Sequence, residues 1–144
     1  MLLFKNGRFH GKDWSFVFPD GCYLDTDPPS AYSCGVSAMN AEQDIRFGIF
    51  EDKREPNMPE QMRRYLFGEN DAYEQDSPIA ETELNGLSGF EVFYHGRNPC
   101  YEVWLSLPDN RMLTFFAEYT ANQTVNVKEH PFVKSFLSDI RKEK

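Results

Sequence analysis

The stretch that decides the fold is FEVFYHGRNPCYEVWLSLPDNRMLTFFAEY, residues 90–119. It contains three runs rich in aromatic and β-branched residues, and two clusters of turn-forming residues, at 96–99 and 108–111, separate the runs. This pattern predicts strands over 90–95, 101–107 and 112–119. Because short turns join consecutive strands, we expect an antiparallel meander.

Large apolar side chains are predicted on both faces of this meander. One face is predicted to carry Phe90, Val92, Tyr94, Tyr101, Val103, Leu105, Met112 and Phe116. The other is predicted to carry Phe93, Trp104, Leu113, Phe115 and Tyr119, diluted by Glu91, His95, Glu102 and Ser106. A sheet with one face in water alternates cleanly between apolar and polar residues, and this one does not. We favour helices or loops covering both faces; an open groove on the second, mixed face is the alternative.

The rest of the chain predicts further strands over 14–18, 22–24, 33–39, 45–50 and 79–84. A short helix is predicted after Asn57, a good N-cap residue with Glu60 three positions later. Its apolar face would hold Met62, Tyr65 and Leu66. An amphipathic helix is predicted from about 130 to 142. The 144 residues therefore predict a single α+β domain, in which helices pack on an antiparallel sheet of about six or seven strands.

Composition excludes several classes of protein. Hydrophobic residues make up 40% of the chain and aromatic residues 15%, which excludes intrinsic disorder. The net charge of -8 argues against a nucleic-acid binder. No apolar run approaches the roughly 20 residues of a membrane-spanning helix. The first residues lack the apolar stretch of a signal peptide, so we expect a cytoplasmic protein, or a periplasmic or extracellular one if a leader has been removed.

The order of elements resembles the PsbP-like superfamily, which includes the photosystem II PsbP proteins and a Ran-binding nuclear-import factor. The resemblance rests on the strand and turn at 16–21 (FVFPDG), the turn at 86–89 (GLSG), the long meander and a terminal helix ending in SDIR at 138–141. It implies an antiparallel sheet sandwiched between helices. It also implies a binding role rather than catalysis, and no family site residue can be carried over to this chain.

Negative charge is concentrated in one segment. Residues 68–83 contain no lysine or arginine but six acidic residues, Glu69, Asp71, Glu74, Asp76, Glu81 and Glu83. Such a field can steer a cationic partner toward the protein. We therefore select Glu69, Asp71, Glu74 and Asp76 as candidate partner-binding residues. A solvated loop that only maintains solubility is the alternative interpretation.

A second constellation has the residue types of a cysteine-dependent enzyme. A four-residue turn over 96–99 would pair His95 with Cys100 across the hairpin, and Glu102 would share their face. A thiol beside an imidazole and a carboxylate is the arrangement that makes a thiolate nucleophile. The sequence lacks a Cys-x-x-Cys pair and an EF-hand spacing, so we predict no metal and no cofactor. A Cys22–Cys34 disulfide stays open for an exported protein.

Together these features favour a non-enzymatic protein-binding module. One concrete form is an inhibitor or immunity protein that blocks a cationic partner through its acidic segment. Two other classes remain as alternatives. They are a carrier of a small ligand in the mixed aromatic groove, and a cysteine-dependent enzyme at the 90–107 hairpin.

Overall fold

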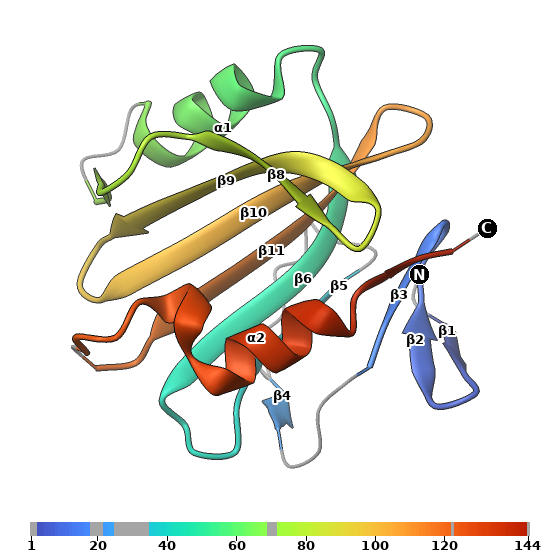
Figure 1. Ribbon diagram of the computed structural model, residues 1–144, viewed down its shortest axis with the longest axis horizontal. Coiled ribbons are helices and arrows are strands. Elements are labelled where there is room, and N and C mark those ends of the chain that lie inside the picture. The colour runs from blue at the N-terminus through green and yellow to red at the C-terminus, as the bar shows by residue number, and fades with distance from the viewer. Residues whose placement is uncertain (1–2, 18–21, 25–34, 69–71, 122, 144) are drawn as a thin grey trace.

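The computed structural model describes residues 3–17, 22–24, 35–68, 72–121 and 123–143 (Figure 1). These residues form two antiparallel sheets, two α-helices and a short 3-10 helix, η1. In chain order the elements are β1 Leu3–Lys5, β2 Arg8–His10, β3 Trp14–Phe16, β4 Tyr23–Leu24, β5 Gly35–Met39, β6 Ile45–Lys53, α1 Met58–Phe67, β7 Glu74–Gln75, β8 Ala80–Leu84, β9 Leu87–His95, β10 Pro99–Leu107, β11 Arg111–Tyr119, η1 Val127–Glu129, α2 Pro131–Ser138 and β12 Arg141–Lys142. The predicted α+β class and the antiparallel meander are confirmed.

The large sheet has the strand order β4-β5-β6-β11-β10-β9-β7, with β8 also paired to β9. Its centre is formed by four nine-residue strands, β6, β11, β10 and β9. The short strands β7 and β8 follow one another along β9, so the eight strands occupy seven positions. This edge of the sheet carries part of the acidic segment.

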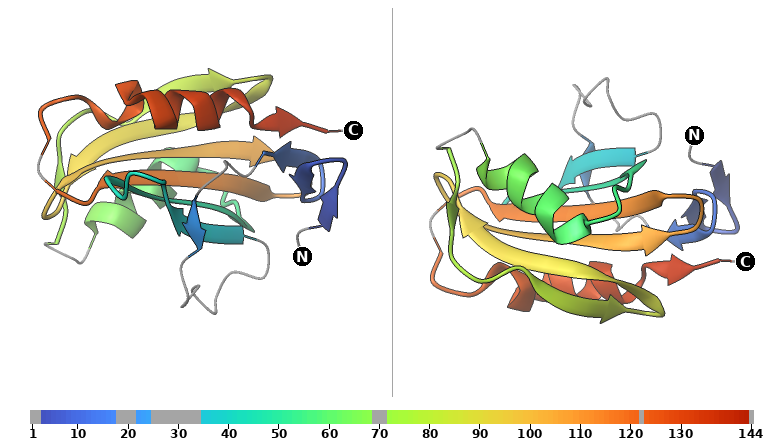
Figure 2. Two further views of the ribbon diagram at one scale, coloured as in Figure 1. Left: turned by 90° about the horizontal axis from the view of Figure 1, so that it is seen from below. Right: turned by 90° about the horizontal axis from the view of Figure 1, so that it is seen from above.

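The two helices lie on opposite faces of the large sheet, α2 on one and α1 on the other (Figure 2). The α2 face holds the large core, which includes Phe47, Tyr101, Phe115 and Val133. The α1 face holds a smaller core of Met58, Met62, Leu66, Val92, Tyr94, Cys100, Trp104 and Met112. Both faces of the meander are therefore covered, as the favoured interpretation predicts.

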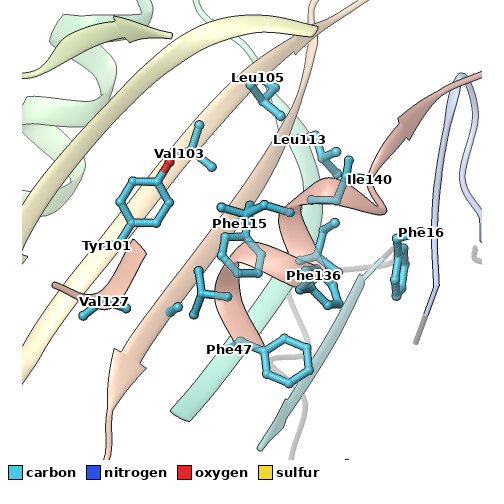
Figure 3. Close-up of a cluster of buried hydrophobic side chains, with 14 of the residues drawn as sticks. Phe16, Phe47, Tyr101, Val103, Leu105, Leu113, Phe115, Val127, Phe136 and Ile140 are labelled. Atoms are coloured by element: carbon cyan, nitrogen blue, oxygen red, sulfur yellow. The ribbon is translucent and has the colours of Figure 1, made fainter. Parts of the chain in front are cut away.

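Aromatic rings gather around α2 in the large core (Figure 3). The ring of Phe136, on α2, lies 5.0 Å from that of Phe47, 5.2 Å from Phe115 and 5.7 Å from Phe16, measured between centroids. Burying aromatic side chains contributes the largest apolar areas of any residue type, and ring pairs in such contacts add further stabilisation. This cluster fixes α2 on the sheet.

The small sheet was not predicted from the sequence. Its order is β1-β2-β3-β12, so β3, which follows the N-terminal hairpin, pairs with a strand that follows α2 (Figure 1). Arg111 on β11 joins the two sheets, because its guanidinium contacts the carboxylates of both Asp13 and Glu51. The indole nitrogen of Trp14 donates to Glu51 at 3.2 Å.

The predicted terminal helix is too long by four residues. It begins as predicted, with Pro131 in its first turn, but ends at Ser138. The next residues turn so that Ile140 is fully buried in the large core, and Arg141 then pairs with Ser15 of β3. Tertiary pairing with the small sheet replaces the last helical turn.

Candidate functional site

The second part of the acidic segment, residues 74–83, lies along one edge of the large sheet. Glu74 lies on β7, Asp76 directly follows it, and Glu81 and Glu83 lie on β8. All four side chains are exposed. We call these four residues the acidic edge. The other two predicted partner-binding residues, Glu69 and Asp71, lie outside the described residues, so their place relative to this edge is not part of the structure.

His95 holds the first half of the acidic edge in place. Its Nδ1 lies 2.8 Å from Oδ1 of Asp76, and its Nε2 lies 3.2 Å from Oε2 of Glu74. The hydrogen bond with Asp76 is the main cause that raises the pKa of His95 above its usual value. Ser77 adds a second attachment, because its hydroxyl oxygen accepts from the backbone N–H of Phe93 at 2.9 Å.

Neither Lys nor Arg side chains neutralise the acidic edge among the described residues. Glu74 is 79% exposed at its side chain and Asp76 is 44% exposed, and their ion-pair partner is His95. The carboxylates therefore do not turn inward to internal cations. The charge of His95, when protonated, offsets at most part of the charge at this edge.

Two large exposed aromatic residues lie near the acidic edge. Tyr65 on α1 is 64% exposed, although its ring packs 5.8 Å from the ring of Trp104. Tyr73, directly before β7, is 40% exposed, and its ring is T-shaped to that of Tyr94 with 5.0 Å between the centroids. The prediction that Tyr65 faces the core is therefore wrong. Exposed tyrosines are enriched in protein–protein interfaces.

The predicted pairing of His95 with Cys100 is wrong. The hairpin loop has three residues, 96–98, so His95 pairs with Pro99 and Cys100 pairs with Tyr94. A one-residue change of register moves a side chain to the opposite face. Cys100 and Glu102 consequently lie on the α1 face, whereas His95 is directed away from them.

Cys100 also lacks the surroundings of a nucleophile. Its side chain is 4% exposed within the small core. Burial, with the negative charge of Glu118 as the next cause, raises the pKa of the thiol to about 12. A thiolate is the reactive form of cysteine, so this environment disfavours the proposed cysteine chemistry. Cys34, the partner in the open disulfide question, lies outside the described residues.

The same register error affected the predicted faces. Tyr101, Val103 and Leu105 lie with Phe93 and Phe115 on the α2 face. Trp104 and Glu102 lie instead with Phe90 and Val92 on the α1 face. The residues assigned to an open groove are in fact covered: Trp104, Leu113, Phe115 and Tyr119 are each at most 2% exposed. The structure gives no support to a ligand groove lined by these side chains.

A buried carboxyl group is the feature that sequence reasoning missed. Glu102 is 4% exposed and accepts from the Tyr94 hydroxyl at 2.8 Å and from the Trp104 indole nitrogen at 2.6 Å. Desolvation raises its pKa to about 7, although both hydrogen bonds oppose that rise. The sequence signal that could have indicated this burial is Glu102 itself, an acidic residue at a position of β10 where the alternation pattern calls for an apolar one. With donors on both oxygens and a helix above it, Glu102 is a structural acid.

The described residues contain no group of three or more histidine, cysteine or acidic side chains arranged to hold a metal ion. At the acidic edge, Glu74 and Asp76 approach different nitrogens of His95, so the three side chains do not converge on one point. What this surface offers chemically is therefore a set of exposed negative charges. Its carboxylates can bind ammonium or guanidinium groups.

Comparisons with known proteins agree with this architecture. No protein-family model matches the sequence, and no curated protein is significantly similar to it. Among solved structures, cyanobacterial PsbP (CyanoP) from Synechocystis sp. PCC 6803 aligns with a TM-score of 0.64 over 90% of this chain and 86% of that one. The chain has a PsbP-like fold. At 10% identity, the similarity to CyanoP concerns the fold alone.

A second structure, from Bacteroides thetaiotaomicron, aligns with a TM-score of 0.47 and 12% identity, covering 92% of this chain and 46% of that one. The PsbP-like fold accounts for the sheet between two helices that the sequence resemblance implied. None of the helices among the described residues is both long and apolar enough to cross a membrane.

Proposed function

We propose that this protein is a non-enzymatic binding module that docks a cationic protein through its acidic segment. The observation that carries the proposal is the acidic edge. Its four exposed carboxylates lie along one edge of the sheet without a lysine or arginine partner among the described residues. Glu69 and Asp71, which precede it in the sequence, extend the negative segment.

The neighbouring tyrosines support the same role. Tyr65 and Tyr73 expose ring surface, yet each is positioned by a buried ring of the small core, Trp104 or Tyr94. Aromatic side chains held in this way lose little conformational entropy on binding. An acidic rim beside such rings matches a partner that combines basic side chains with apolar surface.

The more specific form of the proposal is an inhibitor or immunity protein for a cationic partner. Electrostatic steering raises association rates, and this is the property that a protein blocking a toxic enzyme requires. The structure gives no reason to assign catalysis to the 90–107 hairpin, because its cysteine is buried and its histidine faces the other way.

The test is to neutralise the predicted partner-binding residues together, as Glu69→Gln, Asp71→Asn, Glu74→Gln and Asp76→Asn. The immobilised protein is used to capture binders from a lysate of its source cells, and each captured protein is purified and titrated at 50 and 300 mM salt. We expect weaker binding in the variant and a shallower dependence of affinity on salt.

A matched control removes the same amount of charge elsewhere, at acidic residues that already have local partners. It combines Asp52→Asn, Glu55→Gln, Asp109→Asn and Glu129→Gln. The control should retain the affinity and the salt dependence of the unaltered protein. Equal binding by both variants would show that the acidic segment serves hydration and would contradict the proposal.

A further inference from the structure

The outer side of β8 is an unpaired strand edge among the described residues. β8 pairs with β9 on its inner side, and no other described strand pairs with it. No described loop or turn forms a backbone hydrogen bond with residues 80–84. Such an edge presents N–H and C=O groups that can accept another strand.

The hairpin geometry identifies the residues whose backbone groups point outward. The two-residue turn at Asn85 and Gly86, with φ angles of 51° and 89°, makes Leu84 and Leu87 the first hydrogen-bonded pair. Hydrogen-bonded and non-hydrogen-bonded pairs alternate along antiparallel strands. The backbone groups of Glu81 and Glu83 are therefore directed away from β9.

This edge is held in a fixed position. The side chain of Asn85 donates to the carbonyl oxygens of Leu137 at 3.1 Å and Ile140 at 2.7 Å, which attaches the hairpin to the end of α2. Leu84 packs against the large core, and Ile79, directly before β8, packs against the small core. A preformed edge lowers the entropy cost of adding a strand.

The side chains of the same two residues give the edge its selectivity. Glu81 and Glu83 are both exposed and lie on one face of β8, two positions apart. A strand added in antiparallel orientation would place two of its side chains directly opposite them, about 4.5–5.5 Å away between Cβ atoms. Those positions favour lysine or arginine and disfavour acidic residues, because like charges placed directly opposite are destabilising.

We infer that β8 accepts an extended segment of a cationic partner as an additional antiparallel strand, with basic residues at alternating positions opposite Glu81 and Glu83. This inference rests on the proposed function and specifies its binding mode. Main-chain hydrogen bonds would supply affinity, and the alternating basic residues would supply selectivity.

The direct test uses two fluorescein-labelled peptides of nine residues with the same composition. In one, three lysines alternate with threonine and valine; in the other, the three lysines are three positions apart, so that successive lysines lie on opposite faces of an extended strand. Binding is measured by fluorescence anisotropy at 100 mM salt. We expect the alternating peptide to bind about threefold more tightly, because only this peptide places lysines opposite both Glu81 and Glu83, and one further cross-strand charge pair contributes roughly that ratio.

Two variants and a modified peptide separate charge from backbone pairing. Glu83→Gln removes the carboxylate but keeps the outward N–H, whereas Glu83→Pro removes both without disturbing the bonds to β9. We expect a loss of about threefold for Gln and at least a further tenfold for Pro. N-methylation of the peptide at its central residue should weaken binding to the unaltered protein, and this measurement does not depend on the folding of the proline variant.

Two other results would overturn the inference. Equal binding of the two peptides, with no effect of N-methylation, would overturn strand addition; the proposed function would survive if neutralising Glu69, Asp71, Glu74 and Asp76 still weakens partner capture. If Glu81→Thr with Glu83→Thr causes self-association while neither peptide binds, the two carboxylates only protect the edge from aggregation. That outcome also overturns the inference.

Discussion

The cores on the two faces of the large sheet differ in the residues that compose them. The α2 face is a continuous aromatic and aliphatic core, in which Phe136 contacts rings from three strands. The α1 face is smaller and contains two methionines of α1, a thiol and the buried carboxyl group of Glu102. The first arrangement maximises apolar burial, whereas the second makes the protein sensitive to protonation. The exposed tyrosines lie beside the second, as do Glu81 and Glu83, whereas Glu74 pairs with His95 and shares its face, on the side of α2.

The largest expected effect comes from the aromatic core. Phe136→Ala should lower the free energy of unfolding by about 3–5 kcal/mol, because a cavity would remain among rings that cannot collapse into it. Met62→Leu, at an equally buried position under α1, should cost less than about 1.5 kcal/mol because methionine and leucine have similar volumes. Urea unfolding measures both variants, and a loss for Phe136→Ala as small as that for Met62→Leu would show that the surrounding rings close the cavity.

The next effect is a pH dependence that arises from Glu102. Its pKa is about 7 in the folded protein and about 4.5 when exposed, so the folded state binds its proton more tightly. Stability is therefore expected to fall as pH rises from 4.5 to 7, by about 3 kcal/mol in total, and to level off outside that range. Urea unfolding at pH 5, 6, 7 and 8 measures this slope.

Glu102→Gln should remove most of that slope, although the amide can accept only one of the two hydrogen bonds. It should be less stable than the unaltered protein at pH 5 and approach or exceed its stability at pH 8. His95 titrates in the same direction, because its pKa is also raised on folding. His95→Gln is therefore the matched control, and it should retain the decline caused by Glu102. A slope that disappears only with His95 would assign the effect to the acidic edge.

The sequence predicted the central part of the fold because there local signals and tertiary packing agree. Turn residues at 96–99 and 108–111 separate the meander strands, and Asn57 caps α1 as predicted, accepting from the N–H of Glu60 at 3.2 Å. The N-terminal hairpin was missed, although Asn6 and Gly7 form a turn signal with φ angles of 54° and 77°. β12 carries no such signal, since its pairing with β3 is set by tertiary contacts.

The candidate site was less accessible to sequence reasoning, because it depends on register. The loop at 96–98 is one residue shorter than predicted, so His95 and Cys100 lie on opposite faces of the sheet. Composition cannot distinguish a three-residue loop from a four-residue one. The cluster of acidic residues was easier to predict, since finding it in the sequence does not depend on strand register. The exposure of Glu74 and Asp76 agrees with it, while their contact with His95 needed the three-dimensional structure.

A smaller effect concerns how α2 is anchored. Asn85 has a left-handed φ of 51°, and its amide reaches the carbonyl oxygens at the end of α2. Asn85→Ala should cost about 2 kcal/mol, because it combines lost hydrogen bonds with backbone strain. Asn85→Gly should cost about 1 kcal/mol, since glycine adopts this conformation without strain. Thermal unfolding compares them, and equal losses would show that the hydrogen bonds alone are responsible.

The smallest effect is expected at the start of α1. Asn57→Ala removes the side-chain oxygen that accepts from the first turn, and should cost about 0.5–1 kcal/mol at this exposed position. Asn57→Ser keeps a capping oxygen and is the control. If α1 covers only the small core, hydrogen exchange in the alanine variant should increase at the amides of α1, β9 and β10 but not in α2. An equal increase in both helices would show that the two cores unfold as one unit.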